Sequence, residues 1–180
     1  MQKKLLRWEL AGFLFVGAVG TLLHFVFSWT GNAPPAAAFS AVNESTWEHM
    51  KLLFVPFFLF TMVQFIVFAD PLRNFFAVKS LAVLLGLLSI PALFYTYNGM
   101  LGKSPDWVNI LIFFLADALV FFLSRRLLLR GALRSGAWQL AGFLLLWMLA
   151  FAFVFFTYRP PQLPLFQDPT NGLYGLAAAR

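Results

Sequence analysis

The sequence predicts an all-α fold: a polytopic helical membrane bundle of five transmembrane helices, with residues 1–180 forming a single transmembrane domain. The first observation is composition, since the chain is 61% hydrophobic and only 11% charged. A soluble domain of this size needs more polar surface than that. Second, several apolar runs reach the roughly 20 residues that a helix needs to cross a bilayer. Third, these runs lack the polar–apolar alternation of a membrane β-strand.

The apolar runs predict where each transmembrane helix lies. We expect spans at about 8–29, 49–69, 75–97, 107–124 and 137–158, followed by a tail at 159–180. The tail has four prolines in RPPQLPLFQDP, so an α-helix is not expected there, and DPTNG is typical of a turn. Because the tail is also rich in leucine and aromatic residues, we expect it to fold back over the external mouth of the bundle.

Lysine and arginine predict the orientation, because cytoplasmic segments of membrane proteins are enriched in both. If there are five spans, one side of the membrane holds nine basic residues: Lys3, Lys4, Arg7, Arg73, Lys79, Arg125, Arg126, Arg130 and Arg134. The other side holds Lys103, Arg159 and Arg180, while Lys51 is set aside at a span edge. The N-terminus is therefore predicted to be cytoplasmic and the C-terminus external.

The first apolar run also resembles a cleavable signal peptide, with MQKK before it and the small residues of PPAAAFSA after it. Its length of about 20 residues exceeds the usual 7–15 of a signal peptide, and Glu9 lies near its start. We therefore expect this run to be retained as a span. Glu9 is expected to cap the helix or to reach toward the cytoplasmic interface.

Composition also limits the functions open to this chain. Without cysteine there is no disulfide, no thiolate nucleophile and no cysteine-ligated metal. The basic residues behind the net charge of +6 lie beside the predicted spans. Membrane topology therefore explains the charge, and no nucleic-acid partner is expected. The expected partner is the lipid bilayer, and the sequence identifies no protein partner.

Small and polar residues share one face of the first span. Gly17, Gly20, Thr21, His24 and Ser28 follow the spacing i, i+3, i+4, i+7 and i+11. Small residues allow helix backbones to approach closely, so Gly17, Gly20 and Thr21 are expected to pack against another span. His24 is then directed into the bundle near the external end of this helix.

The segment NESTWEHMK, residues 43–51, precedes the second span. Ser45 and Glu48 have the S-x-x-E spacing of a capping box, and Asn43 is an alternative cap. Capping explains Glu48 but leaves Glu44 and His49 without a structural role. Since consecutive spans are antiparallel, both residues are expected near His24.

Two imidazoles and one or two carboxylates form a suitable ligand set for a divalent transition metal. The candidate functional cluster is therefore His24, Glu44, Glu48 and His49. It would bind a metal ion or act on a lipid-like substrate at the outer face. The alternative is that these residues only begin and stabilise a helix.

Asp117 places a carboxylate near the centre of the fourth span. A charge there costs about 2.5–3.5 kcal/mol on insertion scales, so the group should be protonated or paired with His24, Gln64 or a tyrosine. Asp117 and His24 would suit a small carrier or channel subunit, in which they relay protons. The small-residue face alone would suit a non-catalytic protein that assembles with another membrane protein through this face.

Three blocks of the chain carry a resemblance: WELAGFLF with GTLLHFVF, the NESTWEH segment, and the closing PPQLPLFQDPTNGLYG. They resemble a family of uncharacterised small integral membrane proteins, found mainly in Firmicutes and known only as a domain of unknown function. The resemblance covers nearly the whole chain. It implies a multi-pass protein of the bacterial plasma membrane and transfers no catalytic residue, and Asp117 lies outside the three blocks.

Overall fold

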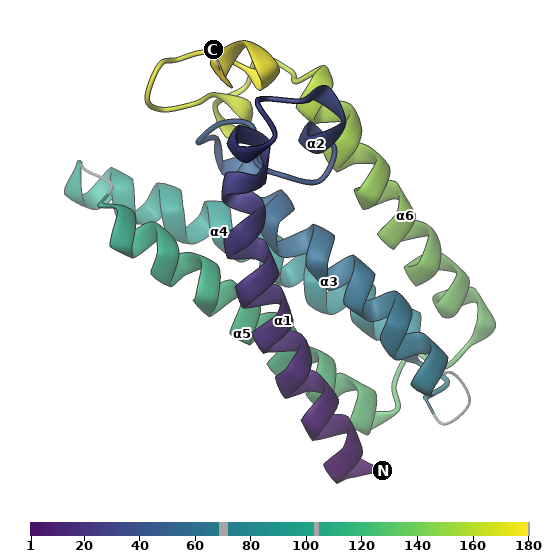
Figure 1. The fold of residues 1–180 in the computed structure, drawn as a ribbon. Helices are drawn as coiled ribbons and strands as arrows, with labels where there is room; N and C mark the ends of the chain where they lie inside the picture. The colour runs from purple at the N-terminus through teal and green to yellow at the C-terminus, as the bar shows by residue number, and fades with distance from the viewer. Residues whose placement is uncertain (69–71, 103–104, 180) are drawn as a thin grey trace.

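Among the residues that the structure describes, five long helices form the bundle, as the sequence predicts (Figure 1). The computed structural model describes residues 1–68, 72–102 and 105–179. The long helices are α1 (Gln2–Trp29), α3 (Thr46–Phe68), α4 (Phe75–Leu101), α5 (Asp106–Arg130) and α6 (Gly136–Tyr158). Each is long and apolar enough to cross a membrane. Three short elements accompany them: α2 (Pro34–Ala37) and the 3₁₀ helices η1 (Pro164–Phe166) and η2 (Gly175–Ala179).

Several helices extend beyond the predicted spans. Helix α1 begins at Gln2 rather than Trp8, because Leu5 is fully buried while the lysines beside it remain exposed. Helices α4 and α5 run on to Gly102 and Gly131, which end them in the left-handed conformation at φ 65° and 68°. An apolar run marks the part of a helix that crosses lipid, whereas a glycine marks where the helix ends. Ala69, the predicted end of the second span, lies outside the described residues.

Helix α3 lies at the centre of the bundle and contacts α1, α4, α5 and α6. Its core side chains include Leu53, Phe54 and Phe57, all almost fully buried. Glycines of α1 face this core: a Cβ added at Gly20 would lie 2.7 Å from the Leu52 carbonyl oxygen of α3. The α1 and α3 backbones can therefore approach closely only because position 20 has no side chain. Thr21, expected on the same face, is instead exposed and bonds the Gly17 carbonyl oxygen.

The tail covers one end of the bundle, over the loop between α1 and α3 (Figure 1). Asn43 donates from its side chain to the Gly175 carbonyl at 3.0 Å, and the Glu44 backbone N–H donates to Asp168 Oδ2 at 3.1 Å. The expected turn is present, with the Thr170 N–H bonded to Asp168 Oδ1 at 2.7 Å. The two chain termini lie at opposite ends of the molecule (Figure 1).

We expect Asp168 to make the docking of the tail dependent on pH. Burial alone would raise the pKa of this carboxyl, but the hydrogen bonds from Thr170 and from the Glu44 N–H outweigh burial and lower the pKa below its ordinary value. The folded-state pKa is lower than the unfolded-state pKa of about 3.9, so the carboxylate stabilises the fold fully above the unfolded-state value. This stabilisation is lost as the pH falls through the folded-state pKa. The difference in melting temperature between wild type and Asp168→Asn should therefore be constant near neutral pH and shrink below about pH 4. A difference that persists at low pH would contradict this role.

The direction of insertion remains a prediction, with the N-terminus cytoplasmic. Cysteines placed at exposed Ser135 and Ala177 test it, since the wild type has no thiol. In intact spheroplasts, a membrane-impermeant maleimide should label the Ala177→Cys protein and leave the Ser135→Cys protein unlabelled until the cells are lysed. The reverse pattern would show that the basic residues do not set the topology.

Candidate functional site

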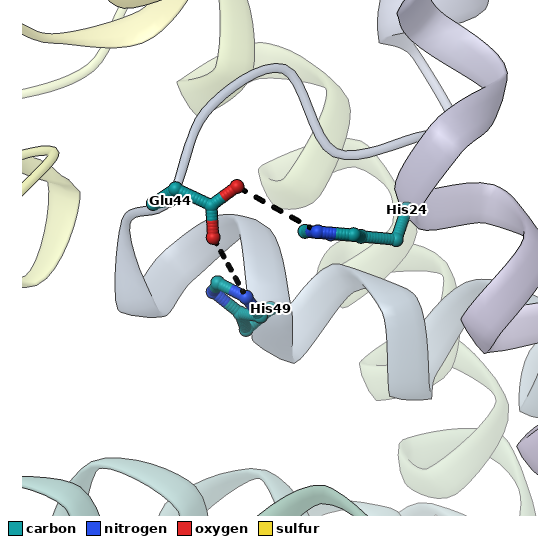
Figure 2. A group of neighbouring side chains, drawn as sticks. All are labelled: His24, Glu44 and His49. Carbon is teal, nitrogen blue, oxygen red and sulfur yellow. Dashed lines mark ion pairs between the residues drawn. The ribbon is translucent and has the colours of Figure 1, made fainter. Parts of the chain in front are cut away.

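His24, Glu44 and His49 converge at the end of the bundle that the tail covers (Figure 2). His24 comes from α1, Glu44 from the loop before α3, and His49 from the first turn of α3. His24 Nε2 lies 3.6 Å from Glu44 Oε1, and His49 Nε2 lies 3.4 Å from Glu44 Oε2. The three side chains are 30%, 47% and 32% exposed, so solvent or a ligand can reach them.

The local sequence builds this site through a chain of short-range hydrogen bonds. Asn43 Oδ1 accepts from the Ser45 N–H at 2.9 Å, and Ser45 Oγ accepts from the Glu48 N–H at 3.4 Å. Ser45 therefore caps α3, with Asn43 forming the turn before it. The Glu48 side chain does not return to the Ser45 N–H, so only half of a capping box forms. The cap places Glu44 just outside the helix and His49 within it.

The Ser45 carbonyl oxygen orients His49. His49 Nδ1 lies 3.0 Å from this oxygen, which can only accept a hydrogen bond. Nδ1 must therefore carry the proton, and in the neutral ring Nε2 keeps a free lone pair directed at Glu44. His24 presents Nε2 to the same carboxylate, while its Nδ1 is buried and has no hydrogen-bond partner among the described residues.

The distances in the cluster suit a shared ion better than direct hydrogen bonds. N–H···O hydrogen bonds are usually about 2.9–3.0 Å long, and 3.6 Å is too long for one. Around a tetrahedral ion with bonds of about 2.0–2.1 Å, ligand atoms lie about 3.3–3.4 Å apart. One ligand atom can be chosen from each of the three residues so that all lie within 4.8 Å of one another. Small side-chain movements would bring them onto one ion.

A pocket of about 340 Å³ opens beside the cluster. His24 and Glu44 line it, together with polar and apolar residues from the end of α1 and the following loop: Phe25, Phe27, Ser28, Asn32, Ala41, Val42 and Asn43. This lining offers an apolar wall and a few hydrogen-bonding groups next to the two candidate ligands. A ligand of modest size could therefore contact the cluster from this side.

Glu48, predicted as part of the cluster, belongs to a separate buried network. Its Oε2 lies 2.6 Å from Nζ of Lys51, and its Oε1 accepts from the Thr157 hydroxyl at 2.7 Å. Lys51 also donates to the Ala37 carbonyl and to Thr157 Oγ1, both at 2.8 Å. All three ammonium hydrogens thus have partners, which a buried lysine requires. Lys51 is fully buried rather than at a span edge, and Glu48 is not available to the histidines.

A second buried ion pair lies toward the opposite end. Glu9 of α1 and Lys79 of α4 are 2.9 Å apart, and Gln64 of α3 donates to the same Glu9 oxygen at 2.8 Å. Three aromatic rings, of Phe57, Phe75 and Phe121, lie 5.5–5.7 Å from the Lys79 ammonium. The expectation that Glu9 caps a helix or reaches an interface is therefore wrong. Lys79, counted as a loop charge, is a fully buried residue of α4.

Asp117 is fully buried in α5, as its position in the span predicts, but the expected partner is missing. Neither carboxylate oxygen has a hydrogen-bond partner in the parts of the chain that the structure describes, so His24 and Gln64 do not pair with it. On α1 it lies beside Gly17, where an added Cβ would be 3.7 Å from Asp117 Oδ2.

Comparison with known proteins agrees with the resemblance seen in the sequence. No curated protein and no solved structure matches the chain. Residues 1–176 match DUF6512, a family described as one of unknown function. The match includes both buried ion pairs, the three-residue cluster and most of the tail, so the chain belongs to the DUF6512 family.

Proposed function

We propose that this protein binds a divalent transition-metal ion of the zinc class through Nε2 of His24, Nε2 of His49 and the carboxylate of Glu44. The observation that carries the proposal is the bond from His49 Nδ1 to the Ser45 carbonyl. Metal-binding histidines usually donate their second ring nitrogen to such an oxygen, because this fixes the tautomer and aims the other nitrogen at the ion. Here the aimed nitrogen faces Glu44.

The ligand chemistry indicates which ions would bind. Two imidazoles and one carboxylate favour zinc and neighbouring divalent transition metals over calcium or magnesium, which take mainly oxygen ligands. Three protein ligands leave the fourth tetrahedral position open, an arrangement found in catalytic rather than structural zinc sites. The open position would be reached through the partly exposed faces of His24 and Glu44.

The pocket suggests what the open position is for. Phe25, Phe27 and Val42 supply apolar surface, while Ser28 and Asn43 supply hydrogen-bonding groups beside it. A lipid-like substrate, with an apolar part and a polar headgroup, fits this combination at the end of a membrane bundle. A metal ion would supply a Lewis acid or a bound hydroxide to such a headgroup.

The proposal predicts metal binding that depends on all three residues. Purified protein without a histidine tag, incubated with zinc and desalted, should retain about one ion per chain as measured by mass spectrometry of the metal. His24→Ala, His49→Ala and Glu44→Gln should each weaken binding by more than about 100-fold, because losing a group that only orients a metal ligand already costs about 10–100-fold. The double histidine variant should be no worse than either single one, since the ligands act as a unit.

Ser28→Ala is the matched control, because Ser28 lines the same pocket and its hydroxyl donates to the Phe25 carbonyl oxygen rather than to the cluster. It should retain the ion. Wild-type protein without metal, or histidine variants that still bind it, would overturn the proposal. His24, Glu44 and His49 would then serve only to join α1 to the start of α3.

A further inference from the structure

A row of buried polar groups, separate from the candidate metal site, runs through the bundle. Asp117 and Ser124 of α5, Thr61 and Gln64 of α3, and Glu9 of α1 are all at most 2% exposed. Each has at least one side-chain oxygen without a hydrogen-bond partner among the described residues. Buried oxygens of this kind are normally satisfied, so five residues that carry them within three adjacent helices require an explanation. We refer to these five residues as the polar seam.

The seam has a direction along the bundle. Gly17 of α1 lies beside Asp117, and Glu9 lies eight residues earlier on α1, or about 12 Å at 1.5 Å per residue. Ser124 is seven residues beyond Asp117 on the same face of α5. Thr61 and Gln64 share one face of α3, and Gln64 bonds Glu9. The seam thus leads from the middle of the bundle toward the end where α1 begins.

We infer that Asp117 is a proton-binding site within the membrane-spanning part of the bundle, and that it exchanges its proton with the medium through this seam. A lone carboxylate with no donor is unfavourable in such a place, whereas the carboxylic acid is neutral. Hydroxyl groups and a carboxamide can each donate and accept hydrogen bonds, and the Glu9 carboxylate can accept them, as a path for protons requires. Glycine at position 17 keeps α1 free of a side chain beside the acid.

The charges around Asp117 favour a proton over a metal cation. The ionisable groups on the neighbouring helices are Lys3, Lys4, Arg7, Glu9 and His24 on α1, Glu48, His49 and Lys51 at the start of α3, and Lys79, Tyr95 and Tyr97 on α4. The Lys79 ammonium contacts the ring of Phe121, one turn from Asp117 on α5. A second cation held near this ammonium would be repelled. A single carboxylate also supplies too few oxygen ligands to replace the hydration of a metal ion.

Infrared spectroscopy of the full chain in metal-free liposomes tests the site. At neutral pH the wild type should show a protonated-carboxyl band that is absent in Asp117→Asn and that disappears as pH is raised. Asp106→Asn is the matched control, because Asp106 is an exposed acid on the same helix, and it should keep the band. If the wild type lacks the band, or if the band survives in Asp117→Asn, the inference is overturned.

The seam itself is tested by exchange of that band into D₂O. Thr61→Val removes a hydroxyl that has no hydrogen-bond partner among the described residues and keeps the shape of the side chain, so the protein should remain at least as stable as wild type. It should slow deuteration of the Asp117 band severalfold. Thr21→Val makes the same substitution at an exposed position on α1 outside the seam, and it should leave the exchange rate unaltered. Equal rates in all three proteins would contradict the seam, and none of these outcomes depends on metal binding.

Discussion

Lys51→Met is expected to destabilise the protein by about 3–5 kcal/mol, the usual effect of removing one partner from a buried ion pair. The ammonium of Lys51 is fully buried and bonds Glu48, Ala37 and Thr157. The Glu48 carboxylate is only 2% exposed, so loss of the ammonium would leave a buried negative charge with no cation beside it. The same loss would remove the hydrogen bonds that join α3 to Ala37 at the end of α2 and to Thr157 near the end of α6. The free energy of unfolding in mixed detergent micelles measures the effect.

Two further variants separate charge from packing in this network. Adding Glu48→Gln to Lys51→Met removes both charges, so the double variant should recover much of the lost stability. Lys3→Met removes a lysine from the exposed start of α1 and should change stability by less than about 0.5 kcal/mol. If Lys51→Met behaves like Lys3→Met, the network does not hold the loop and α6 together.

Much of the fold could be predicted because the hydrophobic signal is strong. Twenty or more apolar residues mark a membrane helix regardless of what it packs against. Helix ends were harder to predict, since Gln2–Arg7 and the stretch up to Arg130 are helical but too polar to belong to an apolar run. Their helical structure depends on tertiary contacts, such as those of Leu5 and Leu128 in one apolar cluster. The sequence of the short helix α2 contains no long apolar run, so this signal could not predict the helix.

The meeting of His24, Glu44 and His49 could be predicted from the antiparallel order of the first two spans. The separate location of Glu48 could not, because a capping box explained this residue without naming another partner. Lys51, three residues later, is the signal that was available: glutamate and lysine at i and i+3 lie on one helix face. It did not enter the prediction because Lys51 was set aside as a charge at a span edge, where a lysine requires no buried partner.

The bond between Gln64 and Glu9 also left a trace in the sequence. From Glu9 to His24 is 24 − 9 = 15 residues, and from His49 to Gln64 is 64 − 49 = 15 residues. In two antiparallel helices that meet at the histidines, Glu9 and Gln64 must therefore lie at the same level. The position of Lys79 could not be predicted in this way, since the sequence does not determine how α4 is placed beside α1 and α3.

The pair of Glu9 and Lys79 should be specific for lysine at position 79. Lys79 is fully buried, and its compact ammonium sits among Phe57, Phe75 and Phe121 while bonding Glu9. Arginine keeps the charge but has a planar, larger head that needs five hydrogen-bond acceptors. Among the residues that the structure describes, only Glu9 provides a charged acceptor there. Lys79→Arg should therefore destabilise the protein by about 2–4 kcal/mol, close to the effect of Lys79→Met.

Comparison with the charge-free pair distinguishes an ionic role from a packing role. Glu9→Gln combined with Lys79→Met should be more stable than Lys79→Met alone, because no carboxylate is then left buried without its cation. The carboxamide oxygen introduced at position 9 can still accept the hydrogen bond from Gln64. Arg7→Lys, an exchange between the same two residue types at an exposed position of α1, should have little effect. If Lys79→Arg is as stable as wild type, the aromatic enclosure is not restrictive, and the pair joins α1 to α4 through charge alone.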